Sequence, residues 1–220
     1  MYRNTLVTLG VVMLANTALA QEAGVQTAGS NAYMSATLGF ALSPDYDYKT
    51  DAGAKGNLSG LNNGFSGAFT GGWLLGGQSD VSYGVEAELL TLSSPTDKYI
   101  INGVTLEGAL NTFAFMAGAG MTNSISDKID LYAGANLGTA GTDMSLKLSA
   151  GTTTETYNTD AYWALAFGGK AGVVYNYSDN LGWQAGYRVL SVGETKDKDA
   201  GWTYDHRLHH IFEGGIRIKY

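Results

Sequence analysis

The sequence contains no cysteine, so no disulfide bond can stabilise the fold. Proline is almost as scarce: Pro44 and Pro95 are the only two, and each lies in a polar, turn-like stretch. This is expected if most of the remaining chain forms sheet, because proline lacks the N–H that a central strand needs. After residue 20 no segment approaches the roughly 18 consecutive apolar residues of a transmembrane helix. A membrane role would therefore require strands.

Basic residues are also few, and this limits the classes of partner. The chain has 13 Lys and Arg against 20 Asp and Glu, which gives a formal charge of −7 at neutral pH. A protein with this charge is a poor match for nucleic acid or for heparin-like polyanions. We therefore expect no nucleic-acid partner.

The first 20 residues have the pattern of a secretory signal peptide. Arg3 supplies the positive charge, residues 6–14 form a short apolar run, and Ala18-Leu19-Ala20 is a small-x-small cleavage site. A retained membrane anchor is the alternative, but the apolar run is short and no stop-transfer pattern follows it. We therefore predict a signal peptide over residues 1–20, a periplasmic lead-in over 21–31 and a folded domain over 32–220.

Apolar and polar residues alternate along most of the folded domain. In residues 208–220, one face carries Leu208, Phe212 and Ile216, whereas the other carries Glu213 and Arg217. Eight segments of about ten residues share this period-two pattern, as transmembrane β-strands do: 33–42, 65–75, 81–90, 109–121, 129–137, 162–175, 181–189 and 208–220.

The connections between these segments alternate between short and long. A soluble lipocalin-like barrel would show the same alternation of residues, but it gives no reason for the alternation of loop lengths. The sequence therefore predicts an all-β fold, an eight-stranded antiparallel up-and-down transmembrane β-barrel, with the long loops extracellular and both termini periplasmic.

Aromatic residues support a position in the membrane. Their expected outward-facing positions lie near the two ends of the strands, where interfacial aromatic girdles occur. The predicted girdle consists of Trp73, Tyr83, Tyr175, Trp183 and Tyr220 near the short turns and Trp163 near the long loops.

The signal peptide, the eight segments, Gly186-Tyr187-Arg188 and the ending F-E-G-G-I-R-I-K-Y (residues 212–220) resemble the OmpA-type barrels. The opacity-type and surface-antigen families are the most similar. The resemblance implies a location in the outer membrane of a Gram-negative cell. It also implies that the barrel-insertion machinery reads the last strand during assembly.

Residues that suggest catalysis or metal binding do not form a convincing site. His206 and His210 would stand roughly 13 Å apart on one face of a strand while His209 points the other way, so one metal ion cannot bind all three. Asp205 beside His206 could imitate part of a hydrolase triad, but no spacing identifies a nucleophile. The acidic stretch containing Asp45 and Asp47 lacks the glycine and distal glutamate of a calcium loop. We expect no catalytic residue, no cofactor and no metal.

The long loops combine aromatic residues with Ser, Thr, Asn and Gly, a composition found in adaptable binding loops. The candidate binding residues are Tyr46, Tyr48, Tyr99, Tyr157, Trp202 and Tyr204. The preferred hypothesis is a surface structural and adhesion protein that binds a host or envelope protein through these loops. The alternative is a small porin-like channel for ions or solutes.

Six charged residues fall on the inward face at similar heights, and an eight-stranded barrel has an interior only just wide enough for side chains. Because a buried charge requires a partner, we predict a closed ion-pair network, with Arg188 and Glu213 as its first pair. A hydrated lumen with solvated charges is the alternative. The six residues are Glu86, Glu88, Lys170, Arg188, Glu213 and Arg217.

Overall fold

The computed structural model describes residues 32–220 except for short gaps at 44–45, 51–52, 54, 59–62, 77–79, 96–98, 102–103, 152, 159–160 and 198–201. The expected signal peptide and the lead-in lie outside the described residues. No helix in the described part of the chain is long and apolar enough to cross a bilayer.

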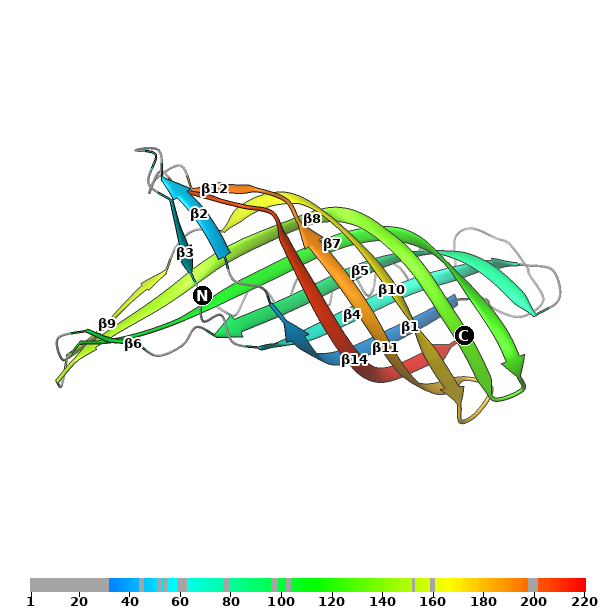
Figure 1. Ribbon diagram of the computed structural model, residues 1–220. Helices are drawn as coiled ribbons and strands as arrows, with labels where there is room; N and C mark the ends of the chain where they lie inside the picture. Colours follow the sequence, from blue (N-terminus) through cyan, green and yellow to red (C-terminus); the bar gives the residue numbers. More distant parts are fainter. Residues whose placement is uncertain are drawn as a thin grey trace. The chain divides into compact units, whose positions relative to one another are not determined.

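Eight strands form a closed antiparallel barrel in which each strand pairs with its neighbours in the chain (Figure 1). The ladder between β7 (Val104–Ser126) and β8 (Ile129–Ala150) joins the two ends of this row of strands and closes the barrel. The predicted fold class is confirmed. The barrel strands are β1 (Ala32–Leu42), β4 (Gly64–Gly76), β5 (Val81–Pro95), β7 (Val104–Ser126), β8 (Ile129–Ala150), β10 (Tyr162–Asn176), β11 (Leu181–Val192) and β14 (Arg207–Lys219).

The first and last barrel strands pair with each other. Tyr33 lies opposite Lys219, and the N–H of Tyr220 donates to the carbonyl oxygen of Ala32 at 2.9 Å. Both ends of the barrel domain therefore lie at the end of the barrel that carries the short turns. The turn between β7 and β8 has only two residues outside the strands, Asp127 and Lys128.

The period-two pattern separates an interior from an apolar exterior. In β14, Ile211, Glu213 and Arg217 are buried, whereas the intervening Phe212 and Ile216 are exposed. Large apolar side chains cover the outside, and Leu38 is 78% exposed. A soluble barrel would place such residues inside, so this exterior is a surface suited to lipid.

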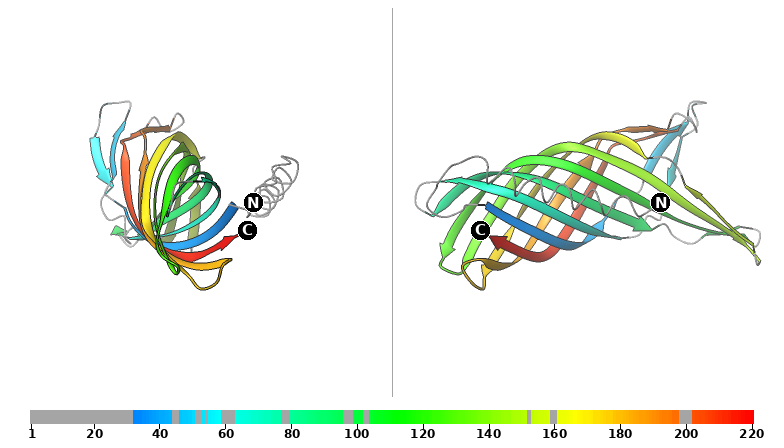
Figure 2. Two further views of the ribbon diagram at one scale, coloured as in Figure 1. Left: turned by 90° about the vertical axis from the view of Figure 1, so that its right-hand side faces the viewer. Right: turned by 180° about the vertical axis from the view of Figure 1, so that it is seen from behind.

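Several strands continue beyond the predicted bounds at the long-loop end, because their polar residues keep pairing after the apolar alternation stops. β7 and β8 stay in register up to Val104 and Ala150, with β6 (Tyr99–Ile101) and β9 (Thr153–Asn158) on their outer sides. We call this four-stranded extension the β7–β8 arm (Figure 2). β6 and β7 pair as a hairpin, with Ile101 opposite Val104, and the two residues that join them, 102–103, lie outside the described part.

A second sheet joins two loops that are distant in the sequence. Its order is β12 (Thr195–Asp197), β13 (Trp202–Tyr204), β2 (Tyr46–Thr50) and β3 (Lys55–Leu58). We call it the β2–β13 sheet, because the pairing of Tyr48 with Tyr204 connects the first long loop to the fourth. The period-two pattern of the barrel strands contains no signal for this pairing.

Candidate functional site

Five charged side chains meet in the middle of the lumen. Lys170 Nζ lies 2.8 Å from Glu86 Oε1 and 3.0 Å from Glu88 Oε2, and Arg188 Nη1 contacts the other oxygen of Glu88. Arg188 also donates twice to Glu213, from Nε at 3.1 Å and from Nη2 at 3.2 Å. The resulting chain of ion pairs, which we call the ionic layer, joins β5, β10, β11 and β14 across the barrel.

Strand register explains why these residues meet. Lys170 of β10 lies opposite Arg188 of β11, so their side chains enter the lumen at the same height. Glu86 and Glu88 both face inward on β5. Glu88 lies between the two cations, so one of its oxygens contacts Lys170 and the other contacts Arg188. Such bidentate and shared contacts are the geometry that makes a buried charge tolerable.

Hydroxyl groups provide further hydrogen bonds to the carboxylates. Thr70 donates to Glu88 at 3.0 Å, and Thr37 donates to Glu213 at 3.2 Å. Tyr33 donates to Glu86 Oε2 at 2.7 Å, whereas the other Glu86 oxygen has no hydrogen bond among the described residues and contacts Lys170 only as an ion pair. These three donors also occupy inward positions, but they were not among the predicted site residues.

Arg217 is at the edge of the ionic layer and makes none of the ion pairs found among the described residues. Its guanidinium carbon lies 4.1 Å from the ring centre of Tyr33 and 5.3 Å from that of Tyr132. Cation–π contacts of this kind stabilise a desolvated guanidinium. The sequence placed Arg217 in the network of ion pairs, and the structure instead places it between two aromatic rings.

Glycines determine where those rings lie. A Cβ atom added to Gly72 would approach the Tyr33 ring to 2.6 Å, and one added to Gly172 would approach the Tyr132 hydroxyl to 2.6 Å. A Cβ at Gly186 would also overlap that hydroxyl. Around Gly72, Gly172 and Gly186 the tyrosine rings, and not the charged side chains, therefore fill the space that the missing Cβ atoms leave.

An apolar layer lies next to the ionic layer on the side of the long loops, and the sequence analysis missed it. Its signal was present, because the period that places Glu88 inward also places Leu90 and Leu92 inward. The layer comprises Ala41, Leu90, Leu92, Ala114, Met116, Ala140, Ala166, Leu190, Val192 and Ile211, all buried.

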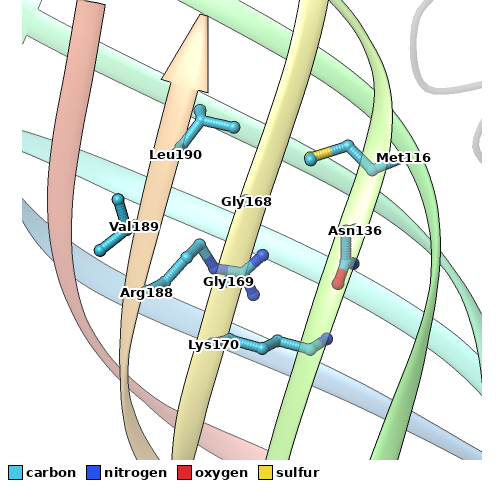
Figure 3. Close-up of a pocket in the computed structure, with 8 residues that line it drawn as sticks. All are labelled: Met116, Asn136, Gly168, Gly169, Lys170, Arg188, Val189 and Leu190. Carbon is cyan, nitrogen blue, oxygen red and sulfur yellow. The ribbon is translucent and has the colours of Figure 1, made fainter.

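The boundary between the two layers is tightly packed. Figure 3 shows Lys170 and Arg188 on adjacent strands, with Met116 and Leu190 on the apolar side. The pocket between them leaves no room for a water molecule. Both polar atoms of the Asn136 side chain lack a hydrogen-bond partner among the described residues, which adds to the cost of burying this position.

The lumen opens at the short-turn end into a polar vestibule of about 660 Å³. At its floor Lys219 Nζ donates to Asp130 at 2.9 Å and to Asn176 at 3.0 Å, and Ser124 donates to Asp130 at 2.6 Å. The vestibule therefore ends in a hydrogen-bonded cluster below the ionic layer. Asp130 and Lys219 were not among the predicted site residues.

The three histidines have separate environments. His209 is buried inside the barrel, where its Nδ1 hydrogen-bonds Ser43 at 3.1 Å. His210 faces outward and contacts the Tyr187 hydroxyl, and His206 contacts Ser191 and stacks on Phe167. No group of three or more possible metal ligands occurs within the described part of the chain.

The predicted girdle residues lie on the outer surface near the ends of the barrel strands. Tyr83, Tyr175, Trp183, Tyr220 and Trp163 are exposed, whereas Trp73 is partly buried. Trp163 stacks on the exposed Phe115, with ring centres 5.9 Å apart.

A row of polar side chains lies on the outer face of the barrel, farther toward the long loops than Trp163 and Phe115. Ser93 donates to Asn111 at 2.9 Å, and Asn111 donates to Asp143 at 2.9 Å. Hydrated groups of this kind mark the upper limit of the apolar band.

All six loop-binding candidates lie in the two extensions beyond the barrel. Tyr46 and Tyr48 are in β2, Trp202 and Tyr204 are in β13, Tyr99 is in β6 and Tyr157 is in β9. Their side chains are outside the described part, but their backbones bring four of them into one sheet.

Comparison with known proteins identifies structural relatives only. Neither a family model nor a curated protein matches the sequence. The outer-membrane protease OmpT from Escherichia coli is 9% identical, with a TM-score of 0.53, and the match covers 89% of this chain and 99% of OmpT. Neisserial surface protein A is 16% identical, with a TM-score of 0.48, over 88% of this chain and 100% of that one. Ail, the attachment invasion locus protein of Yersinia pestis, is 19% identical, with a TM-score of 0.40, and the match covers 85% of this chain and 99% of Ail.

At these identities the likeness to OmpT shows the fold alone. That fold is the outer-membrane β-barrel, and it agrees with the apolar exterior and the exposed aromatic residues of this chain. The described barrel is thus an outer-membrane protein with a filled interior and two extensions at its long-loop end.

Proposed function

We propose that this outer-membrane β-barrel is a surface structural and adhesion protein that binds a host or envelope protein through the β7–β8 arm and the β2–β13 sheet. The observation that carries the proposal is the filled lumen. Both the ionic layer and the apolar layer occupy the barrel interior. The extensions are consequently the part of the molecule that is free to meet a partner.

The composition of the extensions supports the same role. They contain the six aromatic residues among many Ser, Thr, Asn and Gly, and their charged residues are mainly acidic. Aromatic side chains supply large contact areas at low entropic cost, and small polar residues supply adaptable hydrogen bonds. A basic surface on the partner would complement the acidic loops.

Two deletions separate the contributions of the extensions. The first variant removes the β7–β8 arm. Residues 96–108 and 143–161 are each replaced by a two-residue turn, because Pro95 lies opposite Ala109 and Thr142 lies opposite Tyr162. In the second variant residues 44–63 are deleted, which leaves Leu42 and Ser43 as the turn between Ala41 and its partner Gly64. Residues 193–206 are replaced by a two-residue turn, because Val192 lies opposite Arg207.

Binding of purified wild-type and shortened barrels to host cells and to envelope proteins tests the proposal. We expect at least one deletion to abolish binding while circular dichroism still shows a folded barrel. Unchanged binding by both folded variants would rule out adhesion through the extensions. A pull-down with the wild-type barrel would identify the partner.

A channel for ions or small solutes is the competing function. It requires an open path through the lumen, and the pocket beside Lys170 and Arg188 has no room for water. Conductance measurements, described in the Discussion, distinguish the channel from the closed barrel.

A further inference from the structure

The described strands leave four free sheet edges, and all four are in the extensions. The barrel itself has none, because β7 pairs with β8 and closes the ring. The β7–β8 arm ends on β6 at one side and on β9 at the other, and the β2–β13 sheet ends on β12 and on β3. A free edge presents unpaired N–H and C=O groups that can pair with another strand.

Three of these edges have features that discourage pairing. β6 and β12 have only three residues each, and β12 includes Lys196 and Asp197. β3 has four residues and includes Lys55 and Gly56. Short length, lysine and glycine are the usual means of protecting an edge.

β9 has none of these protections. Its six residues read T-T-E-T-Y-N, and all six pair with β8 without a bulge. The side chains of Thr153, Thr154, Glu155 and Thr156 are exposed. Threonine and tyrosine favour strands, and a single charge in six residues is a weak barrier to pairing.

We propose that β9 pairs antiparallel with β9 of a second copy of this chain. In a two-fold symmetric contact the same strand serves as both partners, so each copy supplies the free edge that the other one needs. A register centred on Thr156 places Thr156 opposite Thr156 of the other copy and Glu155 opposite Tyr157, since residues that face each other across an antiparallel pair lie on the same face of the sheet. This register avoids a like-charge pair, which would oppose the contact.

The direction of β9 decides where the second copy lies. β8 is one continuous strand that begins in the barrel wall at Ile129 and pairs with β9 from Ser145 to Ala150. Barrel strands tilt about 35–45° from the membrane normal, so β9 rises largely along that normal. An antiparallel partner runs back toward its own barrel, which places the second copy in a facing membrane.

One such contact is weak, since it adds a single short strand pair. Many copies on two facing surfaces act together, and avidity can exceed the single affinity by about 10²–10⁴. The inferred activity is therefore self-adhesion between membranes that carry this protein. It does not depend on the host or envelope partner proposed above.

Substitutions that place charges at the centre of β9 test the inference. The purified full-length barrel is inserted into lipid vesicles, and clustering of the vesicles is measured by light scattering. Wild-type vesicles should cluster. Thr156→Glu places two glutamates opposite each other at the centre of the contact and should abolish clustering. Thr156→Lys should also fail to cluster alone, because lysine then faces lysine.

Mixing the two kinds of variant vesicle should restore clustering, since the central pair then joins a glutamate to a lysine. Thr105→Glu is the matched control, because it adds one charge to β7, between β6 and β8 in the same arm, and it should cluster like the wild type. Absence of clustering by the wild type, unchanged clustering by Thr156→Glu, failure of the mixture or loss of clustering by Thr105→Glu would each overturn the inference. Because the assay contains no other protein, its failure leaves the proposed host or envelope binding untouched.

Discussion

At the scale of single residues, Glu88 connects the two halves of the ionic layer. One of its oxygens contacts Arg188 and the other contacts Lys170. Arg188 extends the connection to Glu213 on β14. The loss of one member therefore leaves a charged neighbour buried without its partner, which costs more than the pair itself contributes.

Replacement of Arg188 by alanine should lower the free energy of unfolding by about 3–5 kcal/mol, because Glu213 and one oxygen of Glu88 lose their cation. Urea unfolding of the barrel in lipid vesicles, followed by tryptophan fluorescence, measures the change. The double variant Arg188→Ala with Glu213→Gln should lose less than the sum of the single changes. A loss below about 1 kcal/mol for Arg188→Ala would show that the carboxylates are hydrated rather than buried.

Gly186→Ala should destabilise the barrel by about 1–3 kcal/mol, because the new Cβ overlaps the Tyr132 hydroxyl and displaces its ring. Gly71→Ala is the matched control, since a Cβ at Gly71 meets nothing within 4 Å. The control should stay within about 0.5 kcal/mol of the wild type. Equal unfolding midpoints for the two variants would contradict the role assigned to Tyr132.

At this scale the sequence predicts which face of a strand a residue occupies, but it does not predict which side chains touch. The period of two identifies which face carries Arg188, Glu213 and Glu88. It does not give the stagger between strands, and it cannot place the rings of Tyr33 and Tyr132. The cation–π contacts of Arg217 depend on those rings, so they could not be predicted from its inward position alone.

At the scale of strands, the eight barrel strands could be predicted because each has to alternate between lipid and lumen. The extensions lie beyond the barrel wall, so their strands need not alternate between lipid and lumen and leave a weaker signal. The β2–β13 sheet also requires a pairing between two loops more than 150 residues apart, such as Tyr48 with Tyr204. Around the third long loop, the alternation of Met144, Leu146 and Leu148 is a sequence pattern that favours strands continuing past the membrane.

The topology predicts which turns are reachable from outside the cell. Gly151 is exposed in the turn between β8 and β9 and has a φ of 58°, a conformation that suits glycine. A peptide tag inserted there should be labelled on intact cells. A tag between Ser178 and Asp179, in the short turn between β10 and β11, should be labelled only after the outer membrane is opened. Labelling of the second tag on intact cells would reverse the assigned orientation.

At the scale of the whole molecule, two unlike layers close the same lumen. The ionic layer holds opposite strands together by charge, and the apolar layer excludes water by packing. The polar vestibule lies at the short-turn end, where Asp130 and Lys219 hold its floor. A conducting path would thus have to cross two barriers that respond to different substitutions.

Planar-bilayer recordings with single-layer and double-layer variants distinguish the closed barrel from a channel. The wild type should show no steady conductance, and Arg188→Ala alone should stay closed, because Leu90, Leu190 and the rest of the apolar layer still exclude water. Leu90→Ser with Leu190→Ser should also stay closed, since the ionic layer remains. Only the combination of the three substitutions opens a polar path through both layers, and it should conduct. Steady wild-type conductance that Arg188→Ala does not change would refute the closed lumen and favour the channel.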